Sequence, residues 1–374
     1  MIITGSIGSG HVSVARAIKE SLYRIYGGRV RCEIVDIITA CKNIAATATK
    51  KIYLSSLKLS PKIYQKIFEE SGTKEWPLKF YNALCAPFMQ RKLLELMREI
   101  GPNAIVSTFP SWEIIVKKIR EKYEREIKRK IPTVAVVTDS ISVHRAWISG
   151  NPDFFIVAND DTAVSLKNLG VEQNRIKILG YPVSERFTRE TPDNFYEEFG
   201  FSPRKKTLLL ILAPGIQRKK SRAVLEALKK TALKNIQLVI VASGGERIRA
   251  IASRMRFPFP VRIFGWTNSM HRLVRGADIV LTKAGGATVM ECIAAKKPMI
   301  IIDALPGQEA GNALLVEKYN LGAMLNKNPG QLDDAFNYIF KNEQLIKKNL
   351  AAQNKPHAAE NTTKFLMYLV RQSG

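Results

Sequence analysis

The amino-acid sequence predicts an α/β fold made of two doubly wound domains, each a parallel sheet covered by helices. At 374 residues, the chain is longer than the ~100–200 residues typical of one domain. Short β-branched runs alternate with helical patterns along most of it, which is typical of parallel sheets. A polar stretch containing Pro182, Pro192 and Pro203 has no strand pattern. We therefore place the domain boundary in that stretch.

The individual elements follow from the spacing of apolar residues. Ala15, Ile18 and Leu22 lie on one face of a predicted helix, as do Leu225 and Leu228 of another. Seven apolar runs predict buried strands, at residues 133–137, 154–157, 176–179, 208–212, 238–242, 279–281 and 299–302. The predicted parts are a first domain (1–187), a linker (188–205), a second domain (206–360) and a terminal helix that packs on the first domain (361–374).

The chain is strongly basic, with 58 Lys and Arg against 33 Asp and Glu and a net charge of +25. A field of this sign attracts polyanions or anionic lipid head groups. No apolar run approaches the ~20 residues needed to cross a bilayer, and the N-terminus lacks the pattern of a secretory signal. We expect a peripheral protein on the cytoplasmic face of a membrane.

The four cysteines lie far apart, without a C-x-x-C pair, so neither a disulfide framework nor a thiolate zinc site is indicated. No His or carboxylate cluster has metal-ligand spacing either. We therefore expect no metal and no other cofactor.

Residues 42–98 interrupt the α/β rhythm with a basic, helical pattern. The segment has eleven Lys or Arg against four Glu, and aromatic residues such as Phe68 and Trp76 are interleaved with lysines such as Lys62 and Lys66. This mixture suits an amphipathic helix in the head-group region. It equally suits a helical insertion whose aromatic side chains pack on the core. A second basic run, at 117–130, predicts the solvated face of a helix.

A glycine-rich turn opens the chain, where Gly5, Gly8 and Gly10 precede His11 and a predicted helix. Glycines let a backbone approach a ligand, and a helix N-terminus offers unpaired N–H groups to an anion. Ligands of open α/β sheets bind outside the carboxyl ends of the strands, where His11 is placed to take a proton. The structural alternative is a histidine that caps the helix or packs against Trp147.

A second turn of this kind follows the predicted strand 279–281. There Gly285, Gly286 and Thr288 can present N–H and hydroxyl donors to a diphosphate. Glu291 lies about one helical turn further on and can accept hydrogen bonds from a ribose diol. Its alternative role is to complement the helix dipole from the N-terminal turn.

Polar residues also follow the last predicted strand, 299–302. Gln308, Glu309 and Asn312 are clustered there, an arrangement that suits the binding of sugar hydroxyls. The alternative is a loop that caps the next helix.

These motifs form an ordered set. It comprises Gly8-Ser-Gly10-His11, Val137-Thr-Asp139 with His144 and Trp147, Gly180-x-Pro182-Val-Ser184, Phe264-Gly265-Trp266, Lys283-Ala-Gly285-Gly286-x-Thr288-x-x-Glu291 and Pro306-Gly-Gln308-Glu309-x-Gly311-Asn312. In order and spacing, from residue 3 to residue 325, the set resembles the monogalactosyldiacylglycerol synthase and diacylglycerol glucosyltransferase family. That family is related to the peptidoglycan N-acetylglucosaminyltransferase.

The resemblance implies a GT-B fold and transfer of a hexose from a UDP-hexose to diacylglycerol, with inversion, at an anionic membrane surface. It implies that the backbone of Gly265 and Trp266 holds the uracil, and that Glu291 holds the ribose. By the same resemblance, the diphosphate is held by Gly285, Gly286 and Thr288, and the sugar by Gln308 and Glu309, with Asn312 also on the donor side. His11 and Asp139 are the expected catalytic residues, with Gly8, Gly10, His144 and Trp147 on the acceptor side. The resemblance also favours lipid contact by residues 42–98.

One turn departs from the family. After the first strand of the second domain, where the family has a glycine-rich turn, Pro214 and Ile216 flank Gly215 and reduce its freedom. Arg218 and Lys219 follow and are candidates to supply charge to a phosphate instead.

Two other functions remain open from the sequence. One is transfer of N-acetylglucosamine to a lipid-linked acceptor on the same fold. The other is nucleic-acid binding by a basic protein, although the chain has no RRM, KH or zinc-finger pattern, so no nucleic-acid partner is expected. Glucose and galactose differ in the orientation of one hydroxyl, and the sequence favours neither.

Overall fold

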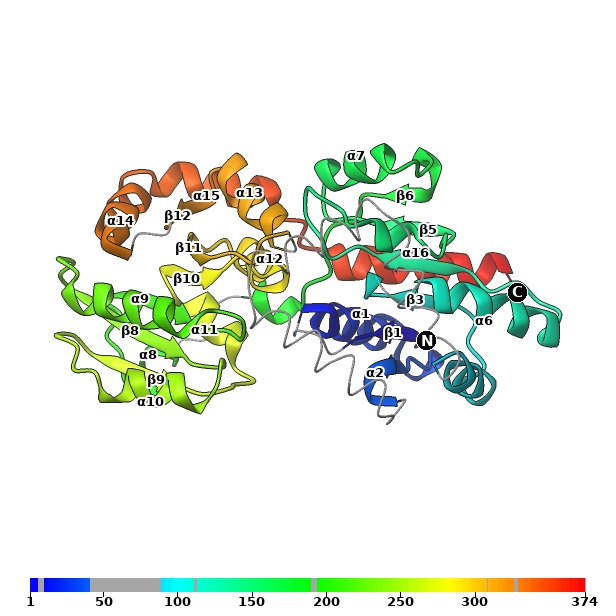
Figure 1. The fold of residues 1–374 in the computed structure, drawn as a ribbon, viewed down its shortest axis with the longest axis horizontal. Coiled ribbons are helices and arrows are strands. Elements are labelled where there is room, and N and C mark those ends of the chain that lie inside the picture. The colour runs from blue at the N-terminus through cyan, green and yellow to red at the C-terminus, as the bar shows by residue number, and fades with distance from the viewer. Residues whose placement is uncertain are drawn as a thin grey trace. The chain divides into compact units, whose positions relative to one another are not determined.

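The computed structural model describes residues 1–5, 10–40, 89–110, 113–189, 194–307, 309–325 and 329–373. The chain divides into two compact units (Figure 1). The first unit comprises Met1–Ser184, Pro306–Gly311 and His357–Gly374, and the second comprises Glu185–Leu305 and Asn312–Pro356.

The first unit is built on a six-stranded parallel sheet in the order β2-β1-β3-β4-β5-β6. Its strands are short and nearly all buried, as expected for a parallel sheet covered on both faces. They are β1 (Ile2–Thr4), β2 (Ile34–Asp36), β3 (Ile105–Ser107), β4 (Thr133–Val136), β5 (Phe154–Ile156) and β6 (Ile176–Lys177).

Helices cover this sheet, among them α1 (Gly10–Tyr26), α2 (Ile37–Ala40), α6 (Glu113–Ile127) and α7 (Asp160–Asn168). The last helix of the chain, α16 (Ala358–Ser373), lies beside α1 in this unit (Figure 1). Phe365 of α16 packs edge-on against Phe154, with ring centroids 5.3 Å apart. Glu360 forms an ion pair with Arg24 of α1 at 3.2 Å.

Most of the basic segment 42–98, including Lys62, Lys66, Phe68 and Trp76, lies outside the described residues. Its end belongs to a helix over residues 89–100. Met89, Leu93 and Met97 of this helix are at most 2% exposed and pack in the core of the first unit. No helix in the described part of the chain is long and apolar enough to span a membrane.

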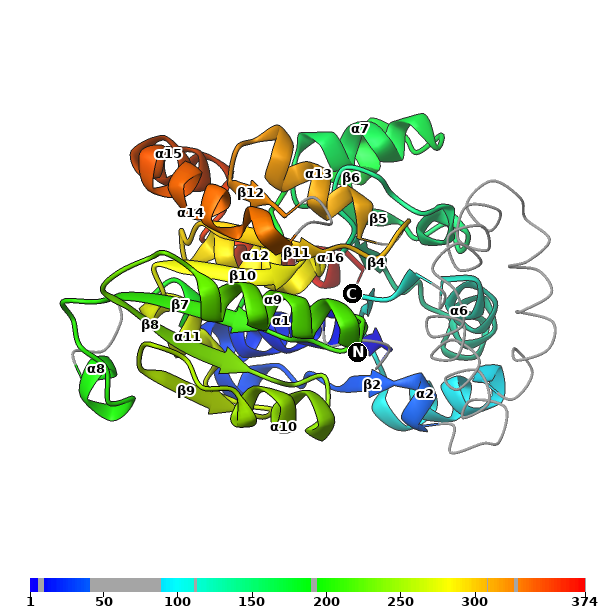
Figure 2. The same ribbon diagram turned by 60° about the vertical axis from the view of Figure 1, so that its left-hand side comes forward.

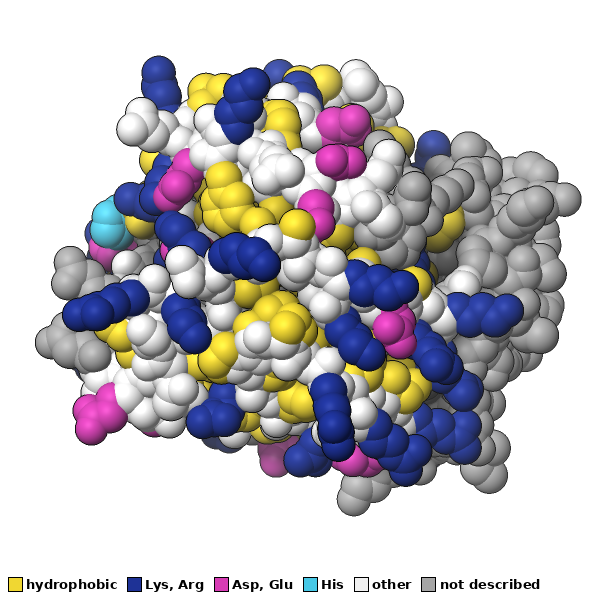
Figure 3. Space-filling model, turned by 90° about the vertical axis from the view of Figure 1, so that its left-hand side faces the viewer, with side chains coloured by type: hydrophobic (Ala, Val, Ile, Leu, Met, Phe, Trp, Pro, Cys, Tyr) yellow, Lys and Arg dark blue, Asp and Glu magenta, His cyan; other side chains and the backbone are white. Residues whose placement is uncertain are grey.

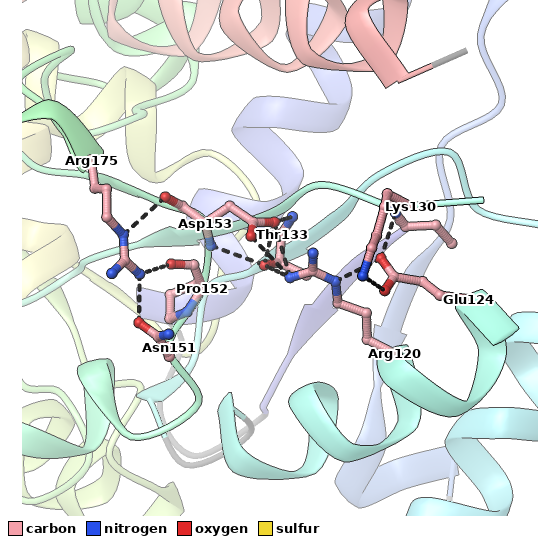
Figure 4. Close-up of polar contacts among 9 residues, drawn as sticks. Arg120, Glu124, Lys130, Thr133, Asn151, Pro152, Asp153 and Arg175 are labelled. Atoms are coloured by element: carbon pink, nitrogen blue, oxygen red, sulfur yellow. Dashed lines mark hydrogen bonds and ion pairs between the residues drawn. The ribbon is translucent and has the colours of Figure 1, made fainter. Parts of the chain in front are cut away.

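The basic run at 117–130 contributes to the interior as well as to the surface (Figure 4). The Arg120 guanidinium of α6 donates to Glu124 at 2.9 Å and to Asp153 at 3.1 Å. Asp153 in turn accepts from the backbone N–H of Thr133 at 2.7 Å, which joins the starts of β4 and β5. Glu124 is only 7% exposed, so this network is a structural clamp at the amino edge of the first sheet.

The second unit has its own six-stranded parallel sheet, in the order β12-β11-β10-β7-β8-β9. Its strands are β7 (Lys206–Ile211), β8 (Ile236–Val241), β9 (Val261–Phe264), β10 (Ile279–Lys283), β11 (Met299–Asp303) and β12 (Gly322–Met324). The central strands β7, β8, β10 and β11 are almost wholly buried and consist mainly of Leu, Ile and Val.

The helices of the second unit follow the strands in turn. They are α8 (Phe195–Glu198), α9 (Arg218–Lys230), α10 (Glu246–Arg254), α11 (Met270–Gly276), α12 (Gly286–Ala294), α13 (Ala310–Lys318), α14 (Leu332–Lys341) and α15 (Glu343–Gln353). Because β7, β8 and β9 are adjacent and connected by right-handed crossovers, α9 and α10 cover the same face of the sheet. The two helices lie next to each other (Figure 2).

The predicted fold class is confirmed, and each of the seven predicted strands overlaps a strand of the structure. The seven predicted strands do not include β1, β2, β3, β9 and β12. Four of these are only three residues long, which is too short for a period to be recognised.

Candidate active site

In the first sheet, the direction of strand order reverses between β1 and β3. Ligands of doubly wound sheets bind beyond the carboxyl ends of the strands at such a switch point. His11 is the second residue of α1 and follows the turn after β1, while Thr108 follows β3 and Thr138 follows β4. Of the turn glycines, Gly10 is the first residue of α1, and Gly8 lies outside the described residues.

The His11 ring is held in one orientation. Its Nδ1 atom lies 2.8 Å from the Thr108 carbonyl oxygen and 3.0 Å from the Thr138 hydroxyl. Because a carbonyl oxygen only accepts, Nδ1 carries the hydrogen and the lone pair of the neutral ring is on Nε2. Burial lowers the pKa of His11 to about 4. His11 is therefore neutral at pH 7, with Nε2 in the form that accepts a proton.

Asp139 lies directly after Thr138, in the loop beyond β4. Its Oδ2 atom accepts from Trp147 Nε1 at 2.8 Å and from the His144 backbone N–H at 3.3 Å. Burial raises the pKa of Asp139 to about 6, and these two hydrogen bonds act in the opposite direction. Two neighbouring titratable groups with opposite shifts are typical of an acid–base site.

Two of the residues predicted on the acceptor side, His144 and Trp147, support this loop. Trp147 is fully buried, and its ring centroid lies 6.5 Å from that of His11. His144 caps the short helical turn at 145–148, and its Nδ1 accepts from the Ala146 N–H at 3.1 Å. Both residues thus position Asp139, and their predicted contact with an acceptor stays a prediction.

The backbone after Asp139 is strained. Ile141 has a φ of +60°, which a β-branched residue rarely adopts, and the Ser142 N–H donates to the Ser140 carbonyl across it at 2.6 Å. The Val143 N–H is held by the Ser165 hydroxyl of α7 at 3.0 Å. Strain of this kind costs ~1–3 kcal/mol and clusters at functional sites.

The second sheet reverses strand order between β7 and β10, so its switch point lies at the turns that begin α9 and α12. Gly285 is the N-cap of α12, with no side-chain cap, and the first helical hydrogen bond runs from Val289 N–H to its carbonyl. Within the described residues, the N–H groups of Gly286, Ala287 and Thr288 have no hydrogen-bond partner. Three such groups at a nine-residue helix can receive a phosphate.

Asn312 fixes the turn before this helix. Its side-chain Nδ2 donates to the Ala284 carbonyl at 2.9 Å, and the residue is 4% exposed. Glu309, which is 6% exposed, belongs to the first unit by its contacts, and Gln308 lies outside the described residues. The predicted contacts of these three residues with a sugar stay predictions.

Glu291 lies in the second turn of α12, and the first turn contains no acidic residue. Burial raises the pKa of Glu291 to about 8. A carboxylate that served the helix dipole would sit in the first turn and be stabilised in its charged form. The structure therefore does not support the helix-dipole role, and the predicted contact of Glu291 with a ribose stays a prediction.

The remaining predicted donor residues follow β9. Trp266 is 72% exposed, and Gly265 lies beside the Arg249 side chain. Among the described residues, neither makes a backbone hydrogen bond, which leaves their backbone groups available for a base edge.

The unusual turn after β7 is also defined. Gly215 has a φ of +97°, and the ammonium group of Lys283 lies over it. Arg218 and Lys219 occupy the exposed first turn of α9, whereas Lys220 forms an ion pair with Asp303 at 2.6 Å.

Sequence reasoning missed the two residues that orient His11. Thr108 follows a three-residue strand that the sequence did not reveal, and Thr138 lies within the motif Val137-Thr-Asp139, where the sequence assigns it no role. The only available signal was their place at strand ends, which needs the strand order to be useful.

Comparison with known proteins identifies the family. Residues 11–183 match the family described as monogalactosyldiacylglycerol (MGDG) synthase, and residues 216–364 match the glycosyltransferase family 28 C-terminal domain. The processive diacylglycerol beta-glucosyltransferase of Bacillus licheniformis is 26% identical over 365 residues, which cover 96% of this chain and 92% of that protein.

Solved structures share the fold. The S. aureus MnaA-UDP co-structure has a TM-score of 0.64 at 14% identity, covering 99% of this chain and 96% of the other. Acinetobacter baumannii MurG has a TM-score of 0.57 at 15% identity, covering 98% of both chains. The fold is GT-B, and the chain belongs to the MGDG synthase and family 28 glycosyltransferases.

Proposed function

We propose that the enzyme transfers a hexose from a UDP-sugar to diacylglycerol, with inversion at the anomeric carbon, at a membrane surface. The family and the activity for which the Bacillus licheniformis relative is named support the acceptor class and make glucose the first candidate sugar. The single observation that carries the proposal is α12: three unpartnered N–H groups at its start and Glu291 one turn later.

The donor half of the reaction is assigned to the second unit. The N–H groups of Gly286 and Thr288 stabilise the charge that develops on the leaving UDP, because a helix N-terminus favours an anion. Glu291 holds the ribose diol, and the backbone of Gly265 and Trp266 holds the uracil.

The acceptor half is assigned to the first unit. The acceptor hydroxyl attacks the anomeric carbon as the bond to UDP breaks, and its proton passes to His11 Nε2. The hydrogen bond of Nδ1 to the Thr108 carbonyl keeps Nε2 unprotonated for this step. Asp139, ionised above its pKa of about 6, stabilises the imidazolium that forms.

A donor panel tests this proposal. The purified protein is incubated with diacylglycerol and, separately, radiolabelled UDP-glucose, UDP-galactose and UDP-N-acetylglucosamine, and the lipids are chromatographed. We expect label in a hexosyl lipid from glucose or galactose. Label transferred only from UDP-N-acetylglucosamine would support the related transferase activity instead.

Membrane contact by residues 42–98 needs its own test, since most of them lie outside the described residues. Replacing Lys58, Lys62 and Lys66 by Glu should release the protein from anionic vesicles, because each cation near such a surface contributes ~1 kcal/mol. Unchanged flotation at low salt would show that another surface makes the contact.

A further inference from the structure

One segment of the second unit is unusually basic. Residues 204–262 contain fifteen Lys or Arg and only two Glu, a surplus of +13 out of the chain's +25. This segment contains β7, α9, β8, α10 and β9. The surplus is thus carried by the three strands that form one half of the second sheet and by the two helices that cover them.

The topology gathers six of these cations at one place. Strands β7, β8 and β9 are parallel neighbours that start side by side. At the start of β7 the Lys206 N–H donates to the Asn235 carbonyl before β8, and near the start of β8 the Leu238 N–H donates to the Pro260 carbonyl before β9. The loops that enter these strands therefore lie within about 10 Å of one another. Helices α9 and α10 run back toward the amino ends of these strands, so their last turns lie beside the loops that enter the strands. We call the six cations of these turns and loops the amino-edge cluster: Arg204, Lys229, Lys230, Lys234, Arg254 and Arg256.

All six side chains of this amino-edge cluster are exposed, and none has an ion-pair partner among the described residues. Of the acidic groups nearby, Asp278 pairs with Lys206 at 3.2 Å, whereas Asp333 accepts from the neutral Thr231 hydroxyl and Ala232 N–H and keeps its charge. The six cations thus leave the cluster with a surplus of positive charge.

Apolar groups accompany the charge. Between Arg256 and Arg262 the chain runs Phe257-Pro258-Phe259-Pro260; both phenyl rings are half-buried, 5.7 Å apart, and both prolines are exposed. On the face of the molecule drawn in Figure 3, Lys and Arg side chains surround apolar patches and outnumber Asp and Glu. Cations beside exposed apolar carbon suit the head-group boundary of a bilayer, whereas a nucleic-acid backbone would use the cations alone.

We propose that the amino-edge cluster, with the Phe257–Pro260 loop, binds the anionic surface of a lipid bilayer. The choice of a bilayer over another polyanion rests on the proposed function, since an enzyme that glycosylates diacylglycerol must meet one. The cluster lies at the amino ends of the strands, whereas the predicted donor residues lie at the carboxyl ends of strands in the same sheet. The proposed membrane contact is therefore separate from the donor residues.

The test compares two charge-reversal variants of the full chain. The edge variant carries Lys229→Glu, Lys234→Glu and Arg256→Glu. The control variant carries the same change in net charge on exposed cations of the first unit: Lys122→Glu, Lys167→Glu and Arg371→Glu. Melting temperatures of both are checked against the parent protein before binding is measured.

Binding is measured by flotation with vesicles of phosphatidylcholine containing phosphatidylglycerol, in the absence of both substrates. The edge variant should partition at least tenfold more weakly than the parent, and the control variant within about twofold of it, as its charges lie elsewhere. Phe257→Ala with Phe259→Ala should weaken the binding that persists at high salt. Equal partitioning of edge and control variants overturns the proposal.

Two further outcomes are decisive. Tighter binding of the parent to duplex DNA than to the vesicles, lost in the edge variant, overturns the bilayer as partner. Transfer to a short-chain diacylglycerol without vesicles should be unchanged in the edge variant. If the parent shows no such transfer, the proposed function fails while the vesicle result still stands, so the two failures are distinguishable.

Discussion

Replacing Glu291 by Gln should remove a proton linkage from nucleotide binding. Burial raises the pKa of this carboxyl to about 8, so near neutral pH it is mostly protonated before a ligand arrives. Ribose hydroxyls donate to the ionised form and would lower its pKa on binding. Binding of UDP-glucose should therefore release about 1.0 proton at pH 6.5 and about 0.2 at pH 8.5.

The same linkage fixes the change in affinity. If the bound carboxyl is ionised throughout, the dissociation constant of the parent falls about 25-fold between pH 6.5 and 8.5. The Gln variant should show no such trend and bind roughly 10- to 100-fold more weakly at pH 8.5, because a hydrogen bond to a charged group is worth ~1.5–3 kcal/mol.

Titration calorimetry in buffers of different ionisation enthalpy measures both quantities, and UDP-glucose has no phosphate that titrates near neutrality. The difference between parent and variant isolates Glu291 from the uracil. A parent that releases no proton and a variant with unchanged affinity would refute the assignment and return Glu291 to a purely structural role.

The linkage also affects stability without ligand. Because the folded pKa of Glu291 lies above its unfolded value of 4.5, its contribution is fully present below pH 4.5 and is lost as the pH rises through about 8. The Gln variant should therefore gain stability relative to the parent as the pH rises from 4.5 to 8, and the difference should level off above pH 8, as measured by thermal unfolding.

Three further predictions concern other parts of the chain. The pH dependence of kcat/KM for the acceptor, measured at saturating donor, should show an acidic limb with a midpoint near pH 4 if His11 is the base and near pH 6 if Asp139 is the base. The Asp139→Asn variant should lose a limb near pH 6 and keep a limb near pH 4. Arg120→Ala should destabilise the first unit by ~2–3 kcal/mol in denaturant unfolding, because it leaves the buried Glu124 with only the exposed Lys130, at 3.4 Å, as an ion-pair partner among the described residues; a loss below 0.5 kcal/mol, the range of an ordinary surface change, would contradict the clamp. Gly276→Ala should cost ~1–3 kcal/mol, since its methyl group would overlap the buried ring of Phe195, and an unchanged melting temperature would show that this packing is looser than described.

The fold was predictable because parallel strands that are buried on both faces must be apolar over their whole length. The runs at β7, β8 and β11 show this directly, with Leu, Ile and Val at nearly every position. Strand β9 was not predicted because Arg262 interrupts its apolar run, and β3 was not predicted because three residues are too few to show a period.

The candidate site was predictable only in part. Glycine turns and Glu291 are visible because their chemistry is local to one strand end and one helix. The threonines around His11 come from strands that are distant in sequence, so they become neighbours only once the strand order is known. The pKa values of His11, Asp139 and Glu291 depend on burial by the tertiary fold, which no spacing of residues reveals.

The product lipid gives the most direct test of the central claim, that this chain transfers a hexose to diacylglycerol with inversion. The protein is incubated with a short-chain diacylglycerol and the UDP-hexose, an α-linked donor, that labels lipid best in the donor panel, and the lipid product is analysed by proton NMR. A β-linked hexosyl diacylglycerol, with turnover reduced ~100- to 10,000-fold in His11→Ala while UDP binding is retained, is the predicted result. Release of UDP without a glycolipid, or an α-linked product, would contradict the account.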